Sequence, residues 1–442
     1  MAEIRPFRGM HYNQSLVKDL SAVICPPYDI ITPQIRQELY HRSEHNFVRL
    51  ESGWELPQDT ATDNKYTRSA TTLGQWLEQG ILKLDQAPAI YLHDHYFTYH
   101  GKEYKRRGII ACVRLEEWDR MVVRPHEGTL AEPKSDRVSL LWALQANTSP
   151  ILALFEDQGQ QVSSLLSAQE QNEPMISLSS AAGERHKVWA ITKPKVINHI
   201  CRSLAHQPLY IADGHHRYES ALTYQRERRT CSPSAGQDEA FNFVMMALVD
   251  FSDPGLIILP PHRLVRGISK ASLNGLRARL KQFFEIEELP LGAPGAWQQV
   301  EAFLNHGEAN QDRLALFGLA PERLLLLKLH DFTTARQMMP YFHCELYKKL
   351  IVSVVDHIIL ERLLGLSSGS EEAILAYSYN SSDAVSRVLD QEYQLAFLLS
   401  PVKVEVVKAI ADMGDRMPRK STYFYPKLPA GLVFYRLRYL AE

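Results

Sequence analysis

The stretch Asp213–Arg217, Asp-Gly-His-His-Arg, gathers residue types that handle phosphate and protons. An apolar run of strand type, Leu209–Ala212, precedes it, and apolar residues follow it at helical spacing, so we predict a strand, a tight turn and a helix. The first N–H groups of a helix lack intrahelical partners and favour an anion. The stretch is therefore predicted to bind a phosphate through Gly214, His215, His216 and Arg217.

The same stretch has a purely structural interpretation, in which Asp213 caps the helix and its neighbours lie on the solvated first turn. Cations at a helix N-terminus are mildly unfavourable unless an anion lies among them, which favours the phosphate site. Adjacent histidines in a helix point about 100° apart, so a metal ion shared by His215 and His216 is the weaker option.

A second polar stretch, Arg124–Arg137, precedes an expected helix at Val138–Ala146. Glu127 can orient or deprotonate a hydroxyl group there. It can equally be a loop carboxylate paired with Lys134 or Arg137, and these two cations can belong to a solvated ion-pair run at a helix start. Lys134 and Arg137 are therefore only possible members of a site.

A third polar stretch, Arg416–Gly431, is bounded by prolines and rich in hydrogen-bonding groups. Its residues Lys420, Ser421 and Thr422 fit an anion-binding loop, and a packed surface loop fits them as well. His262 follows a short expected strand and can reach a neighbouring site, although a residue of a strand-end loop is the simpler interpretation.

The composition limits the classes of function. The 442 residues suffice for two or three domains, and 49 Lys and Arg nearly balance 51 Asp and Glu, so there is no general basic field for nucleic acid. The five cysteines are scattered and form no Cys-x-x-Cys pair, which argues against a disulfide framework. No window approaches the roughly 20 apolar residues of a membrane helix. We expect a cytoplasmic protein without a membrane or nucleic-acid partner, of unknown oligomeric state.

Periodicity predicts a mixed α and β chain, hence the α+β class with a mixed sheet. Asn46–Glu51 alternates like a strand, and Tyr347–Leu364 has the spacing of one long helix. Ala89–Phe97 and Arg107–Leu115 fit a hairpin on either side of a turn. The pattern changes near Gly267, which suggests domains at 1–267 and 268–442. Along the first hairpin strand, His93 and His95 are expected to be exposed and without a role.

Taken together, the chain resembles, nearly end to end, a large bacterial and archaeal family catalogued as domain of unknown function one-thousand-fifteen. The shared motifs are Arg5–Gly9, Pro26–Asp29, Pro125–Glu127 with Pro133, Lys134, Asp136 and Arg137, Asp213–Arg217, Asn242–Leu264 and Met417–Pro426. That name alone implies no activity.

The Asp213–Arg217 block after a strand is also similar to the signature of ParB/sulfiredoxin-fold proteins, and especially of the free-serine kinases, which phosphorylate the hydroxyl of L-serine with a nucleotide. Those kinases carry a Pro-His-Glu stretch upstream and a Pro-Lys-Thr-Thr type loop near the C-terminus, in the same order as here. The resemblance implies a ParB/sulfiredoxin-like core in 1–267 and a C-terminal α/β domain that contributes a substrate loop.

For the individual residues, the resemblance implies Glu127 as the base and Asp213 as a catalytic residue and tentative Mg²⁺ ligand. It implies substrate binding by His126, Lys420, Ser421 and Thr422. The expected function is a small-molecule kinase, a phosphotransferase with an alcohol acceptor, which uses ATP or ADP, Mg²⁺ and a small hydroxy amino acid, best L-serine. The alternative is a nucleotide-binding, ParB-like regulatory switch without small-molecule turnover.

Overall fold

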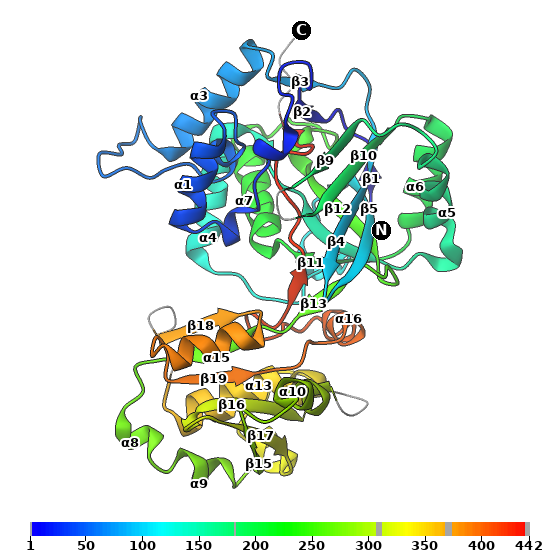
Figure 1. Cartoon of the computed structure of the whole chain (residues 1–442). Coiled ribbons are helices and arrows are strands. Elements are labelled where there is room, and N and C mark those ends of the chain that lie inside the picture. Colours follow the sequence, from blue (N-terminus) through cyan, green and yellow to red (C-terminus); the bar gives the residue numbers. More distant parts are fainter. Residues whose placement is uncertain (1, 181–182, 306–311, 367–373, 438–442) are drawn as a thin grey trace. The chain divides into compact units, whose positions relative to one another are not determined.

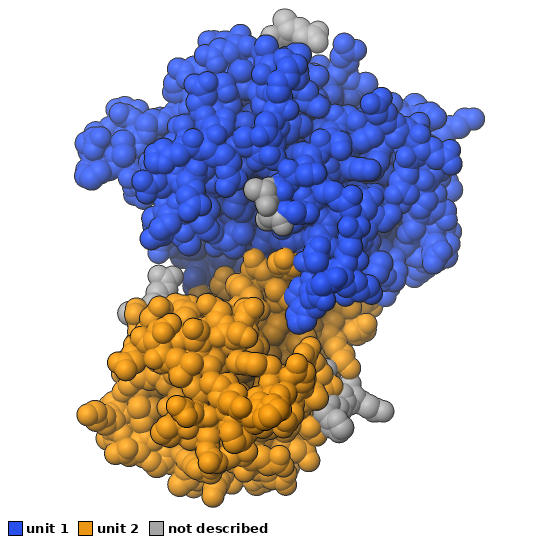
Figure 2. All heavy atoms as spheres, in the orientation of Figure 1, with its two compact units in different colours: residues 1–125, 129–257, 426–442 blue, residues 126–128, 258–425 orange. Residues whose placement is uncertain are grey.

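The computed structural model describes residues 2–180, 183–305, 312–366 and 374–437. The chain forms two compact units, which Figure 2 distinguishes by colour. Unit 1 comprises residues 1–125, 129–257 and 426–442, and unit 2 comprises 126–128 and 258–425. The division into domains at residue 267 stays a prediction.

Unit 1 is built on a nine-stranded mixed sheet with the order β6-β11-β8-β12-β5-β4-β10-β9, in which β1 also pairs with β5 (Figure 1). The pairs β11–β6 and β12–β8 are parallel, and the other pairs are antiparallel. The expected α+β class with a mixed sheet is therefore confirmed. The strands are β1 (Ile4–Arg5), β4 (Ile90–Tyr99), β5 (Lys102–Arg114), β6 (Val123–Arg124), β8 (Ile151–Phe155), β9 (Ile176–Ser179), β10 (Arg185–Ile191), β11 (Leu209–Asp213) and β12 (Phe243–Asp250).

The helices of unit 1 pack on this sheet through apolar side chains that join the core of the strands. Tyr218, Ala221 and Leu222 of α7 and Ile197 and Ile200 of α6 belong to that core. In the view of Figure 1, α5 and α6 lie on one side of the strands and α4 and α7 on the other. The helices are α1 (Pro33–Arg42), α2 (Val48–Glu51), α3 (Lys65–Glu78), α4 (Ala131–Leu144), α5 (Gln161–Gln169), α6 (Pro194–Leu204) and α7 (His215–Cys231).

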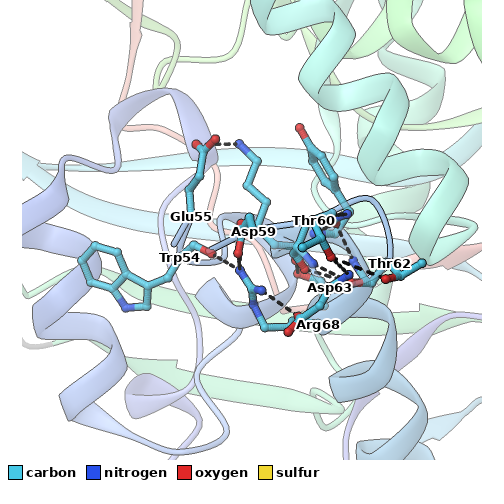
Figure 3. A network of polar contacts seen from close by, with 12 residues as sticks. Trp54, Glu55, Asp59, Thr60, Thr62, Asp63 and Arg68 are labelled. Carbon is cyan, nitrogen blue, oxygen red and sulfur yellow. Dashed lines mark hydrogen bonds and ion pairs between the residues drawn. The ribbon is translucent and has the colours of Figure 1, made fainter. Parts of the chain in front are cut away.

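The loop before α3 is fixed by one arginine of that helix. Arg68 donates to the Trp54 carbonyl at 2.9 Å, to Asp59 at 2.7 Å and to Asp63 at 2.8 Å (Figure 3). A capping box begins the helix, because Asn64 accepts backbone N–H groups of the first turn and Thr67 accepts the Asn64 N–H. This loop is therefore ordered by charge-assisted hydrogen bonds rather than by apolar burial.

The predicted strand at Asn46–Glu51 is wrong, because Val48–Glu51 is the short helix α2. The Asn46 side chain accepts the Val48 N–H at 3.0 Å and donates to the Ala22 carbonyl at 2.8 Å. An asparagine side chain can bond to backbone N–H and C=O groups that would otherwise pair with a neighbouring strand, and it can thereby start a helical turn. The alternation of apolar residues in Asn46–Glu51 did not reveal these bonds. The hairpin of β4 and β5 is confirmed by nine paired residues from Tyr91↔Ile110 to Tyr99↔Lys102.

Unit 2 contains a six-stranded sheet with the order β15-β17-β16-β19-β14-β18, and its recorded pairs are antiparallel. Alternate residues of β16 enter two different cores: Leu314 and Leu316 enter one, and Ala315 and Phe317 the other. The sheet is therefore buried on both faces. Its strands are β14 (His262–Val265), β15 (Phe284–Pro290), β16 (Arg313–Ala320), β17 (Arg323–Leu329), β18 (Leu375–Ser378) and β19 (Leu395–Leu398).

The predicted single helix at Tyr347–Leu364 is interrupted. The chain adopts extended geometry at Leu350, with φ −63° and ψ 129°, between α12 (Glu345–Lys349) and α13 (Ile351–Ser353). A π-helix at Val354–Leu363 follows. The other helices are α8 (Lys270–Leu273), α9 (Leu276–Leu280), α10 (Ala296–Asn305), α11 (Phe332–Gln337), α15 (Ser381–Leu389) and α16 (Val404–Asp412). In the described residues, we find no helix with both the length and the apolarity to cross a bilayer.

Candidate functional site

The predicted strand, turn and helix around Asp213–Arg217 are confirmed in unit 1. Strand β11 ends at Asp213, and α7 begins at His215. Gly214 occupies the N-cap position with φ 97°, a conformation that glycine adopts without steric cost. An added Cβ at Gly214 would also lie 2.9 Å from the Arg217 Nε. The interpretation of Asp213 as the helix cap is therefore wrong.

The carboxylate of Asp213 lies between two cationic side chains. Its Oδ2 accepts from Arg217 Nη2 at 2.7 Å, and its Oδ1 contacts the Nζ of Lys427. Burial alone would raise the pKa of Asp213, but Lys427 and Arg217 outweigh it and hold that pKa far below its usual range. Asp213 is consequently an anion that orients two cations at the start of α7.

Lys427 is a member of this cluster that the sequence did not reveal. Its Nζ also lies 3.8 Å from Asp29 Oδ2, and its side chain is 9% exposed. Burial would lower the pKa of Lys427, whereas Asp213 and Asp29 raise it above its ordinary value. The available signal was a lone cation between Pro426 and Pro429. Its partner lies 214 residues earlier, which no local pattern indicates.

The donor set at Asp213 does not fit a Mg²⁺ ligand in this arrangement. Mg²⁺ prefers carboxylate oxygens that can face it together with water. Here one oxygen of Asp213 accepts from a guanidinium and the other contacts an ammonium group. Coordination would require the carboxylate to exchange a cationic partner for the metal. The arrangement is better suited to holding Arg217 and Lys427 for an anion.

The three side chains after Gly214 are engaged differently. His215 is 7% exposed. His216 accepts the Leu130 N–H through Nε2 at 2.9 Å. Arg217 turns inward and donates through Nη1 to the Ser149 hydroxyl at 3.2 Å and to the Pro150 carbonyl. Their predicted role in phosphate binding stays a prediction.

Lys134 and Arg137 lie in helix α4, which begins at Ala131, earlier than the sequence indicated. Arg137 pairs with Asp136 and donates to the Glu51 carbonyl at 2.8 Å. Lys134 Nζ lies 4.0 Å from Glu219. Both cations therefore belong to ion pairs of unit 1.

In unit 2, the second and third polar stretches meet. Glu127 and Met417 form a parallel bridge, and Glu127 Oε1 accepts the Lys420 N–H at 3.0 Å. His126 Nε2 lies 2.9 Å from the Thr422 hydroxyl oxygen. The five residues predicted to act on the acceptor thus converge from segments almost 300 positions apart, namely His126, Glu127, Lys420, Ser421 and Thr422.

The loop that carries these residues is held by a buried arginine. Arg263, which is 0% exposed, donates to the Lys420 carbonyl at 3.0 Å and pairs with Asp356. Ser421 donates to the Pro418 carbonyl at 2.5 Å. Lys420 itself has φ 55°, a left-handed conformation uncommon for a residue with a side chain. The bonds from Arg263 and Ser421 hold this loop in that conformation.

His262 lies in β14 and is 2% exposed. Its Nδ1 accepts the Leu399 N–H at 3.0 Å, and its Nε2 lies 2.9 Å from the Ser381 hydroxyl oxygen. Burial, with a smaller contribution from Arg263, lowers the pKa of His262 to about 3. His262 is therefore a neutral side chain that joins β14 to the residue after β19 and to the start of α15, and its role in a site stays a prediction.

The expectation that His93 and His95 are exposed is wrong. They are 4% and 0% exposed and form a buried cluster in unit 1 with His186, Glu184 and Arg106. Ligand atoms of His95, Glu184 and His186 lie within 4.8 Å of one another, as in a metal site. However, Arg106 donates to His95 Nδ1 at 3.2 Å, so His95 Nε2 carries the proton that Glu184 accepts at 2.7 Å. The Nε2 of His95 therefore carries a proton that donates to Glu184, so it has no lone pair for a metal ion.

Arg106 joins this cluster to the chain segment that carries Lys427. Its Nη2 donates to the Pro426 carbonyl at 2.8 Å, and the side chain is 2% exposed. Burial lowers the pKa of Arg106 to about 10, well above neutrality, so the guanidinium remains charged. The residue before Lys427 is thus fixed by a buried cation.

Comparison with known families gives one match. The family model described as "Protein of unknown function (DUF1015)" matches residues 4–345, which include Glu127 and Asp213–Arg217 but not Lys420–Thr422. No curated protein matches the sequence.

Several solved structures are similar at low identity. A free serine kinase in complex with AMP is 15% identical, with a TM-score of 0.36 over 74% of this chain and 92% of that one. A conserved hypothetical protein from Pyrococcus furiosus is 15% identical, with a TM-score of 0.34 over 74% and 95%. SbnI with a C-terminal truncation, from Staphylococcus aureus, is 9% identical, with a TM-score of 0.35 over 73% and 85%.

Proposed function

Because the chain belongs to the DUF1015 family, whose description assigns no activity, we propose a function from its own side chains. The protein is a small-molecule kinase that transfers phosphate from a nucleotide to a hydroxyl group. Free L-serine is the best candidate acceptor, and ATP or ADP is the donor. The motif resemblance in the sequence supports this choice of acceptor, and the geometry of each unit supports the chemistry.

The observation that carries the proposal is the contact between Glu127 and the Lys420–Thr422 loop in unit 2. A kinase of this kind needs a carboxylate that orients or deprotonates the acceptor hydroxyl. Glu127 is held for such a task by the Lys420 N–H at 3.0 Å. The Lys420 ammonium group and the Thr422 hydroxyl come from the same loop. Cation, hydroxyl and carboxylate together suit a small hydroxy amino acid or its phosphate.

The start of α7 in unit 1 supports the phosphate half of the proposal. A 17-residue helix begins there behind a glycine, so its first N–H groups and its dipole favour an anion. Arg217 and Lys427 add two cations, which Asp213 holds in place. Phosphoryl transfer is promoted mainly by positioning and by offsetting the charge of the transferring group. These groups supply that kind of stabilisation.

The test is a direct assay of the full chain with radiolabelled ATP or ADP, supplied as the Mg²⁺ complex, and L-serine. We expect O-phosphoserine only when serine is present. Glu127→Gln should reduce its formation by about 10²- to 10⁴-fold, and Glu405→Gln on the exposed first turn of α16 serves as a matched control. Tight nucleotide binding without any serine-dependent transfer would contradict the kinase and leave the regulatory switch.

A further inference from the structure

A small pocket lies between α4, α7 and the segment before β8, entirely within unit 1. The centres of water molecules can occupy a volume of about 40 Å³ in this pocket. A single water needs roughly 10–15 Å³ by the same measure. One part of the lining is polar and the other is aliphatic. The polar side chains include Glu51, Arg137, Ser149 and Arg217, and the aliphatic ones include Leu140, Leu141 and Val244.

Glu51 supplies a carboxylate with an unused oxygen. The residue is 1% exposed, and its Oε1 accepts from the Ser149 hydroxyl at 3.0 Å and from the Tyr28 N–H at 3.3 Å. Among the residues that the structure describes, no donor lies within hydrogen-bonding distance of Oε2. A buried carboxylate oxygen is costly unless a donor meets it. The pocket is the space from which such a donor can come.

Arg217 supplies the complementary group. Its Nη1 and Nη2 are bonded to Ser149, Pro150 and Asp213, whereas its buried Nε finds no acceptor in the described ranges of the chain. The Ser149 hydroxyl links the two side chains, since it donates to Glu51 and accepts from Arg217. Glu51 and Arg217, which both line the pocket, therefore lie close together on either side of Ser149.

We propose that this pocket binds a small free α-amino acid as its zwitterion. The ammonium group would donate to Glu51 Oε2, and the carboxylate would accept from Arg217 Nε. The side chain would lie against Leu140, Leu141 and Val244, and the limited volume restricts it to a few atoms. An amine alone or a carboxylate alone satisfies only one of the two buried groups. The inference goes beyond the proposed function, because such binding requires no phosphate transfer.

Calorimetric titration of the full chain tests the pocket without nucleotide. We expect L-serine and L-alanine to bind, and we expect ethanolamine and L-lactate, each of which lacks one charged group, to bind at least tenfold more weakly. L-Tryptophan should not bind, because its side chain exceeds the pocket. Equal binding of ethanolamine and L-serine, no binding of any small amino acid, or binding of inorganic phosphate that displaces L-serine would each overturn the proposal.

Two substitutions locate the site. Glu51→Gln keeps the shape but removes the charge, and it should weaken L-alanine binding at least tenfold. Glu38→Gln on the exposed face of α1 is the matched control.

A second variant serves if Glu51→Gln does not fold. Leu140→Phe narrows the pocket beside its aliphatic side chains and should weaken L-serine binding more than glycine binding. Unchanged affinity in the folded variants would overturn the proposal. Amino-acid binding in a protein without kinase activity would separate this inference from the proposed function.

Discussion

The Lys420 N–H donates a hydrogen bond of 3.0 Å to Glu127 Oε1, across 293 positions of sequence. The bond restricts the carboxylate to one orientation beside a loop that also carries a serine and a threonine. A carboxylate held in this way can accept a proton from a hydroxyl group that lies against it.

Glu127→Gln should therefore reduce turnover by about 10²- to 10⁴-fold and leave nucleotide affinity nearly unchanged. The amide can still accept the Lys420 N–H, so the loop should keep its conformation. Steady-state kinetics and nucleotide titration on the same preparation measure the two effects. Full activity in the variant would remove Glu127 from the mechanism.

Lys427→Met should destabilise the protein by about 3 kcal/mol, because it removes one of the two cations that pair with the largely buried Asp213 carboxylate. Urea unfolding measures the loss. Lys408→Met breaks an exposed pair with Asp412 and should cost less than about 1 kcal/mol. Asp213→Asn combined with Lys427→Met should recover part of the stability, and strict additivity of the two changes would contradict the pairing.

His216→Ala should weaken nucleotide binding about tenfold, which corresponds to about 1.4 kcal/mol. The variant also removes the acceptor of the Leu130 N–H, so its unfolding free energy is measured beside its nucleotide affinity. Arg217→Ala should lose both binding and stability, because it also removes the bonds to Ser149 and Pro150. His199→Ala on the exposed face of α6 is the control. Nucleotide affinity equal to wild type in His216→Ala would contradict the phosphate site.

From the pKa of Asp136, we expect the free energy of unfolding to depend on pH in the acid range. Burial would raise its pKa, but Arg137 and Lys65 outweigh that effect and lower it from 3.8 to about 2. A carboxyl group whose pKa is lowered by folding stabilises the folded protein at pH values above its pKa in the unfolded chain. This stabilisation is lost as the pH falls through its pKa in the folded protein. The contribution of about 2 kcal/mol should therefore disappear between about pH 4 and pH 2.

Asp136→Asn should remove this dependence, so that the difference in unfolding free energy from wild type narrows as the pH falls through that window. Asp119→Asn, an exposed change, should leave the profile unchanged. A constant difference between pH 5 and pH 2 would show that the Asp136 charge does not stabilise the fold.

The sequence predicted local features better than distant pairings. The turn at Gly214 and the hairpin of β4 and β5 could be predicted because periodicity and glycine act over a few residues. The burial of His93 and His95 could not be predicted. Side chains alternate between the two faces of a strand, but the sequence of the strand does not tell which face other elements of the fold cover. The strand prediction at Asn46–Glu51 failed because the Asn46 side chain accepts the Val48 N–H and also bonds to the Ala22 carbonyl, 24 positions away. Lys427 was missed because its partner Asp213 is brought to it only by the complete fold of unit 1.

The bond from Arg106 to the Pro426 carbonyl has a consequence for synthesis. Residue 426 is translated after all of unit 2, and the same returning segment pairs Ala430 with Cys25 and Phe434 with Met10. A nascent chain that has completed β5 therefore holds the Arg106 guanidinium without that carbonyl until some 320 further residues have been added. At about 5–20 residues per second, this interval lasts on the order of 15–60 s. Unit 1 cannot complete its core during that time, and it depends on the ribosome finishing an inserted unit first.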